Sequence, residues 1–510
     1  MTMKRTQCFH DLKEHLMEFE YCHARKMKKQ LKYMFELTKE GNPPFRGVGG
    51  CFWPFYSLLF LMIFMASCTT SGEKKQEKIK APFQLMTIDP GHFHAALVQK
   101  KELPWVDSTV HIYAPGGPDL DLHLARIDGF NSRSDNPTNW KSKVHTGSDF
   151  FDQMIKEKPG NIAVFAGNNQ KKTEYIHAVV QANLNVLSDK PMAINKEDFQ
   201  LLEKTFNLAE TKGLTVYDLM TERYEITNML QKELSHIEVI FGTLEKGTAD
   251  DPAVTKESVH HFFKYVSGSV LTRPPWFFDV NQEGDGIVDV TTHLVDLIQW
   301  ACYPGEVIDY ENDVEINSAK RWTTDLSLSQ FSEVTKTDSF PEYLTGALKN
   351  DSLLGVYSNG EINYKLKDVH AKVSVTWAYK APEGGGDTHF SIMKGSKANL
   401  IIRQGQDQGF TPTLYIEPSE QSEEYKEAVV SAFQSVTDKY SGVTLKEIEN
   451  GWIVDVPESY HVGHEAHFTQ VMKKFLEYMK NDNMPDWEVP NTITKYFITT
   501  TALELAKEAQ

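Results

Sequence analysis

Residues 83–94 read Phe-Gln-Leu-Met-Thr-Ile-Asp-Pro-Gly-His-Phe-His, and this stretch decides the fold. Its first six residues form a short apolar run that is typical of a buried strand, and Asp89-Pro90-Gly91 is a turn sequence. A helical pattern follows from His92. A strand, a tight turn and a helix N-terminus in this order can present backbone N–H groups to an anion, although a turn without a ligand would have the same pattern.

Apolar runs of the same kind recur along the chain, at residues 110–114, 162–166, 185–187 and 214–219. Helical patterns separate them, and strands that alternate with helices predict right-handed crossovers and a doubly wound parallel sheet of the α/β class. Ligands of such sheets bind at the carboxyl ends of the strands. We therefore expect a parallel-sheet domain over residues 81–222.

The pattern changes after residue 222, where strands are separated by long polar loops. Residues 371–379 alternate apolar and polar side chains, which indicates a sheet that is solvated on one face. Residues 389–393 and 398–403 are expected to be neighbouring strands, residues 323–353 mostly loops, and residues 465–479 a last helix. These features predict a second domain of the α+β class over residues 223–510.

The composition excludes some partners. The chain has 510 residues and a net charge of -17, with 53 basic and 70 acidic side chains. Such an acidic protein does not suit the phosphate backbone of a nucleic acid. Cys302 is the one cysteine after residue 68, so disulfides and a cysteine-based zinc site are excluded from the predicted domains.

Residues 1–80 are typical of a leader. An uncharged apolar stretch at 51–68 ends in Ala66-Ser67-Cys68, which resembles a bacterial lipobox, and basic residues precede it. We expect export to the periplasm or the outer face of the cell envelope, with a lipid on Cys68 and a polar tether at 69–80. An uncleaved membrane anchor is the alternative.

Two further stretches carry residue types that suit proton transfer. In residues 284–296 (GDGIVDVTTHLVD), Asp289 and His293 are four apart, so a helix would place both on one face, where a carboxylate can orient an imidazole. A packed core histidine is the alternative. Lys190 follows a predicted parallel strand in Ser-Asp-Lys-Pro, so its ammonium can polarise a substrate oxygen in the cleft, unless it is simply a solvated lysine.

A cluster near the C-terminus does not predict a metal. His464-Glu465-Ala466-His467 lacks the H-E-x-x-H spacing, and no third ligand is evident, so we read these as helix-start or cleft residues and expect no metal site. The glycine-rich loop at 383–387, beside His389, is expected to cover a polar ligand or to be only a hairpin loop.

Taken together, these motifs resemble the glucose–fructose oxidoreductase / inositol dehydrogenase / MocA (Gfo/Idh/MocA) family. Asp189-Lys190-Pro191 is similar to the Glu-Lys-Pro of that family, and Asn168-Asn169 and His177 fall where it has an Asn and a helix His. Residues 284–293 match its G-G-x-x-x-D-x-x-x-H element, and Trp276 lies upstream as its aromatic often does. The leader and the altered turn suggest a divergent branch.

The resemblance implies a Rossmann domain that binds NAD or NADP, a sugar or polyol held against a large, mostly antiparallel open sheet, and a homo-oligomer. It implies that Lys190 polarises the reacting oxygen, that His293 exchanges its proton and that Asp289 orients His293. The residues implied at the cofactor are Asp89, Pro90, Gly91, His92, Phe93, His94, Asn168, Asn169, Asp189 and Lys190. Those implied at the substrate are Lys264, Arg273, Trp276 and His389.

The cofactor turn departs from the family. Of the three glycines in G-x-G-x-x-G only Gly91 is present, and Asp89 and His94 hold the outer places. No acidic residue directly follows residues 110–114, so NAD and NADP cannot be distinguished from a ribose-binding carboxylate.

Three functions remain open. The first is an NAD(P)-dependent oxidoreductase acting on a saccharide or polyol, and the second is a glycoside hydrolase of the same family that uses NAD without net consumption. The third is a carbohydrate-binding lipoprotein without catalysis. Product analysis separates the first two, and the presence of a bound nucleotide separates both from the third.

Overall fold

The computed structural model describes residues 82–266, 269–350 and 352–509. The predicted leader, with the apolar stretch 51–68 and Cys68, lies outside these residues. Within them, no helix combines the length and the apolar character that crossing a membrane requires.

Six strands form one parallel sheet in the order β3-β2-β1-β4-β5-β6. The strands are β1 (Leu85–Ile88), β2 (Thr109–Ala114), β3 (Lys141–Thr146), β4 (Ile162–Phe165), β5 (Asn185–Ser188) and β6 (Val216–Asp218). The connecting helices are α2 (His94–Leu97), α3 (Pro118–Ser132), α4 (Phe150–Glu157), α5 (Lys172–Gln181) and α6 (Lys196–Lys212). The strand order reverses at β1, which confirms the predicted doubly wound sheet and places a ligand-binding edge beside β1 and β4.

The second sheet has ten strands in the order β10-β12-β13-β7-β14-β15-β16-β18-β17, with β11 paired to β12. Its strands are β7 (Val254–Phe263), β10 (Val314–Ser327), β11 (Leu348–Lys349), β12 (Leu353–Leu366), β13 (Val369–Lys380), β14 (Thr388–Lys394), β15 (Ala398–Arg403), β16 (Thr413–Pro418), β17 (Thr444–Ile448) and β18 (Gly451–Asp455). Only β7 and β13 pair in parallel. The prediction of a mostly antiparallel sheet is confirmed.

Further elements connect and cover the two sheets. The helices are α7 (Ile226–Ser235), α8 (Glu238–Phe241), α9 (Thr291–Cys302), α10 (Tyr310–Asp313), α11 (Leu328–Thr335), α12 (Glu423–Lys439), α13 (His464–Asn481) and α14 (Glu488–Glu508). Short 3-10 turns are η1 (Thr221–Tyr224), η2 (Pro275–Phe278), η3 (Glu342–Ala347), η4 (Gln406–Gln408) and η5 (Glu458–Tyr460), and β8 (Tyr265–Val266) pairs with β9 (Ser269–Val270).

Two predictions of local structure are wrong. Residues 323–353 are not mainly loops, because β10, α11, η3 and β11 occupy much of this range. The helix at 465–479 is not the last one, since α14 follows it. Both segments carry mixed polar and apolar residues whose partners are distant in the sequence, so their local pattern is weak.

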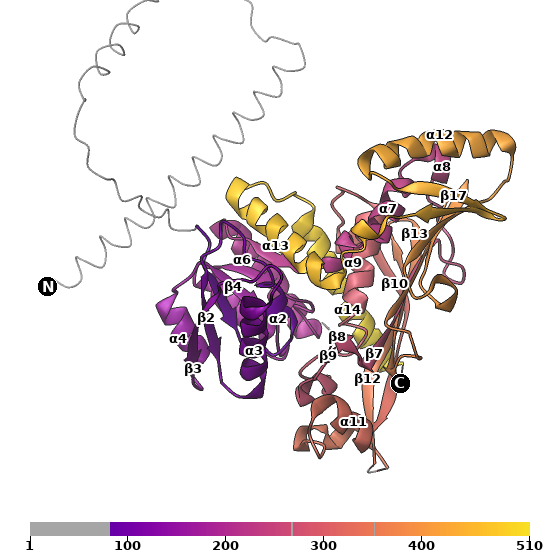
Figure 1. Cartoon of the computed structure of the whole chain (residues 1–510). Helices are drawn as coiled ribbons and strands as arrows, with labels where there is room; N and C mark the ends of the chain where they lie inside the picture. Colours follow the sequence, from indigo (N-terminus) through magenta and orange to yellow (C-terminus); the bar gives the residue numbers. More distant parts are fainter. Residues whose placement is uncertain (1–81, 267–268, 351, 510) are drawn as a thin grey trace, which may run out of the picture. The chain divides into compact units, whose positions relative to one another are not determined.

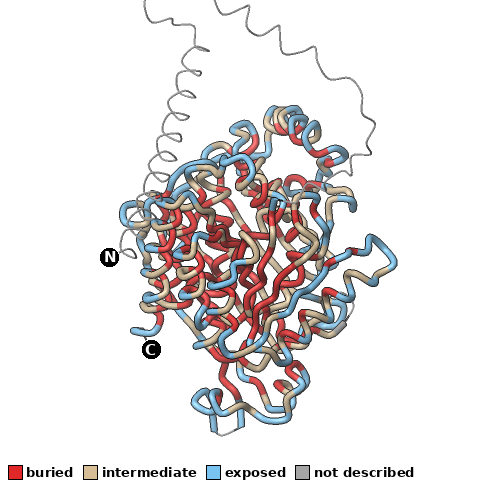
Figure 2. The backbone as a smooth tube through the Cα atoms, turned by 90° about the vertical axis from the view of Figure 1, so that its left-hand side faces the viewer, coloured by how far each residue is buried: buried red, intermediate tan, exposed pale blue. Residues whose placement is uncertain are grey.

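The two C-terminal helices return to the parallel sheet, and Figure 1 shows α13 in yellow beside the indigo and magenta strands. Phe468 and Phe475 of α13 share an apolar core with Leu85 and Ile112 of the parallel sheet. In α14, Leu503 packs in the core of the second sheet. Figure 2 shows buried backbone concentrated in the central strands, with exposed loops around them.

A buried network of ion pairs links α14 to the parallel sheet and to the helix α9 beside the second sheet. Nζ of Lys495, a side chain with 0% exposure, lies 2.9 Å from Asp218 Oδ2 at the end of β6 and 3.1 Å from Asp296 Oδ1 on α9. Arg223 of η1 donates to both oxygens of Asp296, at 2.6 and 2.7 Å, and to Glu488 of α14. Burying these charges is tolerable only because each is paired.

We predict that Lys495→Met lowers the free energy of unfolding by about 3–5 kcal/mol, because it leaves Asp218 without a cation in a buried site. Urea unfolding followed by circular dichroism measures the change. Lys439→Met is the matched control, since Lys439 pairs with Glu233 at the surface and its loss is expected to cost less than about 1 kcal/mol. Equal losses in the two variants would contradict the buried network's role.

Candidate active site

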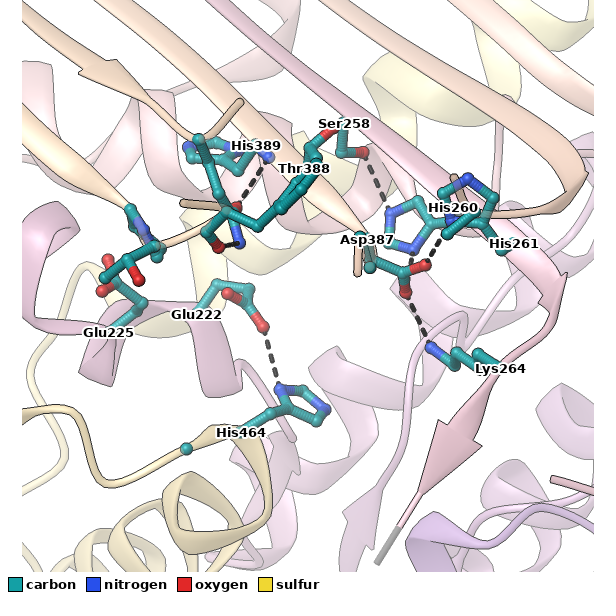
Figure 3. A pocket seen from close by; sticks show the side chains of 18 of the residues that line it. Glu222, Glu225, Ser258, His260, His261, Lys264, Asp387, Thr388, His389 and His464 are labelled. Atoms are coloured by element: carbon teal, nitrogen blue, oxygen red, sulfur yellow. Dashed lines mark hydrogen bonds and ion pairs between the residues drawn. The ribbon is translucent and has the colours of Figure 1, made fainter. Parts of the chain in front are cut away.

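A large cavity with ionisable side chains on its wall lies where η1, α9, β7 and α13 meet, with a volume of about 1290 Å³. Figure 3 shows two groups of interacting side chains on its wall, one around Glu222 and one around Asp387. The ionisable lining residues include Glu222, His260, Lys264, His293, Asp387 and His464. The predicted substrate residues Lys264 and His389 also line it.

His293 lines the cavity, but Asp289 does not orient it. The helix α9 begins at Thr291, so Asp289 lies in the preceding turn and the predicted shared helical face is wrong. Nδ1 of His293 is buried and has no hydrogen-bond partner within the described residues. Burial, together with the charge of Lys190, lowers the pKa of His293 to about 4, so its ring is neutral at pH 7.

Lys190 and Asp289 meet, although they are far apart in the sequence. The ammonium of Lys190 donates to the carboxylate of Asp289, and both side chains are buried. Burial opposes the charge on Lys190, but Asp289 and Asp189 raise its pKa above the ordinary value. The lysine is therefore a permanent cation that can polarise an oxygen but cannot act as a base.

Glu222 and His464 form a second ionisable group on the cavity. Glu222 lies in η1, directly after β6, and its Oε1 is 3.1 Å from Nδ1 of His464, the first residue of α13. Burial raises the pKa of Glu222, but the hydrogen bond and charge of His464 outweigh it and hold the pKa well below the usual range. Glu222 was not singled out from the sequence, although its position after a parallel strand is a signal that could have found it.

Asp387 gathers three donors at the other end of the cavity. Its carboxylate lies 3.2 Å from His260 Nδ1, 3.1 Å from His261 Nδ1 and 2.8 Å from Lys264 Nζ. Burial opposes ionisation, but these hydrogen bonds and charges hold the pKa of Asp387 well below its usual range. Beside it, Nε2 of His389 is buried and has no partner within the described residues.

The other two predicted substrate residues lie outside the cavity. Arg273 is buried and donates to the carbonyl oxygens of Phe262 (2.8 Å) and His261 (3.0 Å). Trp276 donates from Nε1 to Asp119 Oδ2 at 2.7 Å. Neither side chain lines this cavity, so their predicted contact with a substrate stays a prediction.

The predicted cofactor turn is covered by the chain itself. A Cβ atom on Gly91 would lie 2.8 Å from Cζ2 of Trp276, so the indole packs directly on the turn. Pro90 is buried, Asp89 and Phe93 are half-buried, and the helix α2 has only four residues rather than the longer one predicted. A single helical turn offers little dipole to a pyrophosphate.

The remaining predicted cofactor residues also have protein partners. Asn168 Nδ2 donates to Gln282 Oε1 (2.7 Å), and Asn169 Nδ2 donates to the carbonyl of Glu283 (2.7 Å). His177, which the family resemblance singled out, faces Thr205 of α6 instead. The segment 276–289, which we call the strap, therefore lies across the carboxyl ends of the parallel strands.

These contacts test whether a dinucleotide fits. The space left at the turn has a volume of about 10 Å³, whereas small-molecule sites usually measure roughly 300–1000 Å³. With Trp276 on Gly91 and both asparagines bonded to the strap, the residues present do not fit a dinucleotide in the described conformation.

His92, His94 and Asp189 are the one group of the described residues with the spacing of metal ligands, within 4.8 Å of one another. Asp189 Oδ2 lies 2.8 Å from Nδ1 of His94 and 3.6 Å from Nδ1 of His92. Lys172 donates to the Asp189 carbonyl, and Lys190 lies nearby. The carboxylate of Asp189 is thus hydrogen-bonded to His94, and cationic side chains lie around the cluster.

Comparison with known proteins identifies the family. Residues 230–507 match the family described as "Putative oxidoreductase C terminal domain". A structure described as a "putative oxidoreductase" from Parabacteroides merdae is 52% identical, with a TM-score of 0.83 over 84% of this chain and 99% of that one. No curated protein matches.

More distant structures share the fold alone. An oxidoreductase domain protein from Kribbella flavida is 14% identical, with a TM-score of 0.56 over 84% of this chain and 98% of that one. A levoglucosan dehydrogenase, in complex with NADH and levoglucosan, is 11% identical, with a TM-score of 0.53 over the same shares. The chain is therefore an oxidoreductase of the family that carries this C-terminal domain, built on the fold of the Gfo/Idh/MocA dehydrogenases.

Proposed function

We propose that this oxidoreductase acts on a hydroxyl or carbonyl group of a saccharide or polyol, with NAD or NADP as its redox partner. The observation that carries the proposal is the large cavity lined by His293 and other ionisable side chains, together with Lys190, which follows β5 and stays protonated. The fold shared with a levoglucosan dehydrogenase that binds NADH supports the choice of ligand class.

The cavity offers the groups that bind a polyhydroxylated molecule. The carboxylate of Asp387 can accept from substrate hydroxyls, and Lys264 and His389 can donate to ring or hydroxyl oxygens. Lys190 would stabilise negative charge on the reacting oxygen once Asp289 is drawn away. A nicotinamide, when bound, would supply the hydride chemistry.

One observation favours a second candidate function. Because the strap fills the crevice that a dinucleotide would occupy, the chain as folded also suits a saccharide-binding protein without catalysis. In that case the cavity would bind saccharides, and no nucleotide would be detected on the purified protein.

We also propose that the protein is exported and held at the cell envelope by a lipid on Cys68. The lipobox-like sequence, in residues outside the described part, supports this. Metabolic labelling with palmitate should label the wild-type protein and not the Cys68→Ala variant. Labelling of both proteins would contradict the assignment of the lipid to Cys68.

We predict that glucose, myo-inositol or levoglucosan is oxidised with NAD⁺ or NADP⁺, measured by absorbance of the reduced nicotinamide. Lys190→Met should lower kcat/KM by roughly 10²-fold or more, because it removes the cation that would polarise the reacting oxygen, and His293→Ala should lower it because the ring lines the substrate cavity. His145→Ala on β3 is the control, expected to keep the wild-type rate. Wild-type rates in both site variants would contradict the assigned roles. If the protein binds a saccharide but neither turns it over nor binds a nucleotide, the second candidate function is favoured.

We further predict that Trp276→Ala raises the affinity for NAD⁺ about tenfold, because binding to the wild type must first displace the indole from Gly91. Isothermal titration calorimetry measures the affinity. Trp322→Ala, a partly exposed tryptophan on β10, serves as the control and should leave the affinity unchanged. An unchanged or weaker affinity in Trp276→Ala would show that the indole does not close the crevice.

A further inference from the structure

His293 is poorly placed for the proton exchange that the family resemblance implies. The carboxylate expected to orient its ring, Asp289, is engaged with Lys190 instead, and Nδ1 of His293 is buried without a partner in the described residues. Burial and the charge of Lys190 lower the pKa of His293 to about 4, although the charge of Glu222 raises it, and no carboxylate of the described residues is hydrogen-bonded to Nδ1 of its ring. Such an imidazole is a weak base near neutral pH. The reaction therefore needs a better proton acceptor on the same cavity.

The Glu222–His464 pair has the arrangement that His293 lacks. The carboxylate of Glu222 faces Nδ1 of His464 at 3.1 Å, so it fixes the ring and stabilises the imidazolium when the ring takes a proton. The His464 side chain is 42% exposed and lines the cavity. Its Nε2 has no hydrogen-bond partner in the part of the chain that the structure describes, and so it is free to meet a ligand. Figure 3 shows the contact as a dashed line.

The two residues come from rigid elements that the core holds in place. Glu222 follows the central parallel sheet through β6, and its neighbour Arg223 is bonded to α9 and α14. His464 begins the eighteen-residue helix α13, and its ring packs 5.3 Å from that of Phe468 in the apolar core. The titratable and charged groups around the pair are Glu465 and His467 on α13 itself and, from other parts of the chain, His94, Lys100, Glu225, His293 and His389.

We propose that His464, positioned by Glu222, exchanges the proton of the reacting hydroxyl in place of His293. In the oxidation direction the substrate O–H bond breaks, and its proton forms a new N–H bond at Nε2 of His464. The O–H electron pair becomes the second bond of the carbonyl group, while the electron pair of the broken C–H bond would leave as hydride to the NAD⁺ or NADP⁺ of the proposed function. Glu222 stays ionised and holds the imidazolium. The inference rests on the proposed function, and it makes His464 a catalytic residue and Glu222 a positioning residue.

The test uses the full-length protein with the fastest substrate of glucose, myo-inositol and levoglucosan. His464→Ala should lower kcat by roughly 10²-fold or more, with partial rescue by added imidazole, while Glu222→Gln should lower kcat about tenfold and shift the acid limb of the pH profile. The matched controls are His145→Ala and Glu157→Gln, a second His–Glu pair 3.9 Å apart, outside the cavity. Loss of activity in His293→Ala with wild-type activity in His464→Ala would overturn the proposal.

A substrate-free measurement keeps the proposal separate from the proposed function. Diethyl pyrocarbonate acylates neutral imidazoles, and peptide mapping by mass spectrometry gives the rate at each histidine. The rates are compared at a pH high enough that the imidazole is neutral in both proteins, so that they report the nucleophilicity of the ring. His464 should then react faster than His293, and several-fold more slowly in Glu222→Gln than in the wild type. Faster reaction at His293, or no effect of Glu222→Gln, would overturn the role of the pair even if none of the three saccharides is turned over. If His464 reacts with the reagent as expected but none of the saccharides is oxidised, the proposed function is contradicted, whereas the pairing of Glu222 with His464 is supported.

Discussion

The arrangement of the site depends on the ammonium of Lys495. This buried cation touches Asp218, which ends a strand of the parallel sheet, and Asp296, which lies on the helix beside the second sheet. A buried ammonium is costly unless it stays paired, so the two carboxylates are held at a fixed separation. Glu222 is four residues after Asp218, and His293 is three residues before Asp296. Their positions on the cavity therefore follow from one ion network behind it.

In this chain the parallel sheet has the usual topology, but the strap covers the edge at which such sheets bind a dinucleotide. The parallel sheet has the topology of dinucleotide-binding domains, but Trp276 occupies the place over Gly91, and Asn169 is bonded to Glu283. A nucleotide must exchange these contacts for its own, so the fraction of molecules with an open crevice sets the apparent affinity. Topology alone therefore does not decide whether a Rossmann sheet binds a dinucleotide, and the side chains at its edge do.

The sequence predicted the elements whose burial is uniform and missed those defined by distant partners. The runs that became β1, β2 and β4 are almost wholly apolar, because both faces of these strands are covered. By contrast, β3 is an edge strand with the exposed sequence Lys-Ser-Lys-Val-His-Thr, which has no apolar period to detect. The family resemblance placed Lys190 and Asp289 in one site, but it did not predict that they bond to each other, since that contact is tertiary.

The same limit applies to the two histidines, because the basicity of an imidazole depends on tertiary contacts that a motif does not show. His293 belongs to a recognisable element, yet its helix is buried and the nearest carboxylate of that element faces a lysine. His464 belongs to no such element, but a helix that starts at the cavity leaves its ring half in solvent, and the end of β6 supplies a carboxylate from 242 residues earlier in the chain. The basicity of a histidine depends on whether a carboxylate contacts its ring and on how far the ring is exposed to solvent. Both are set by the packing of the folded chain. Proton transfer is thus assigned more securely from the contacts of each imidazole than from its place in a family pattern.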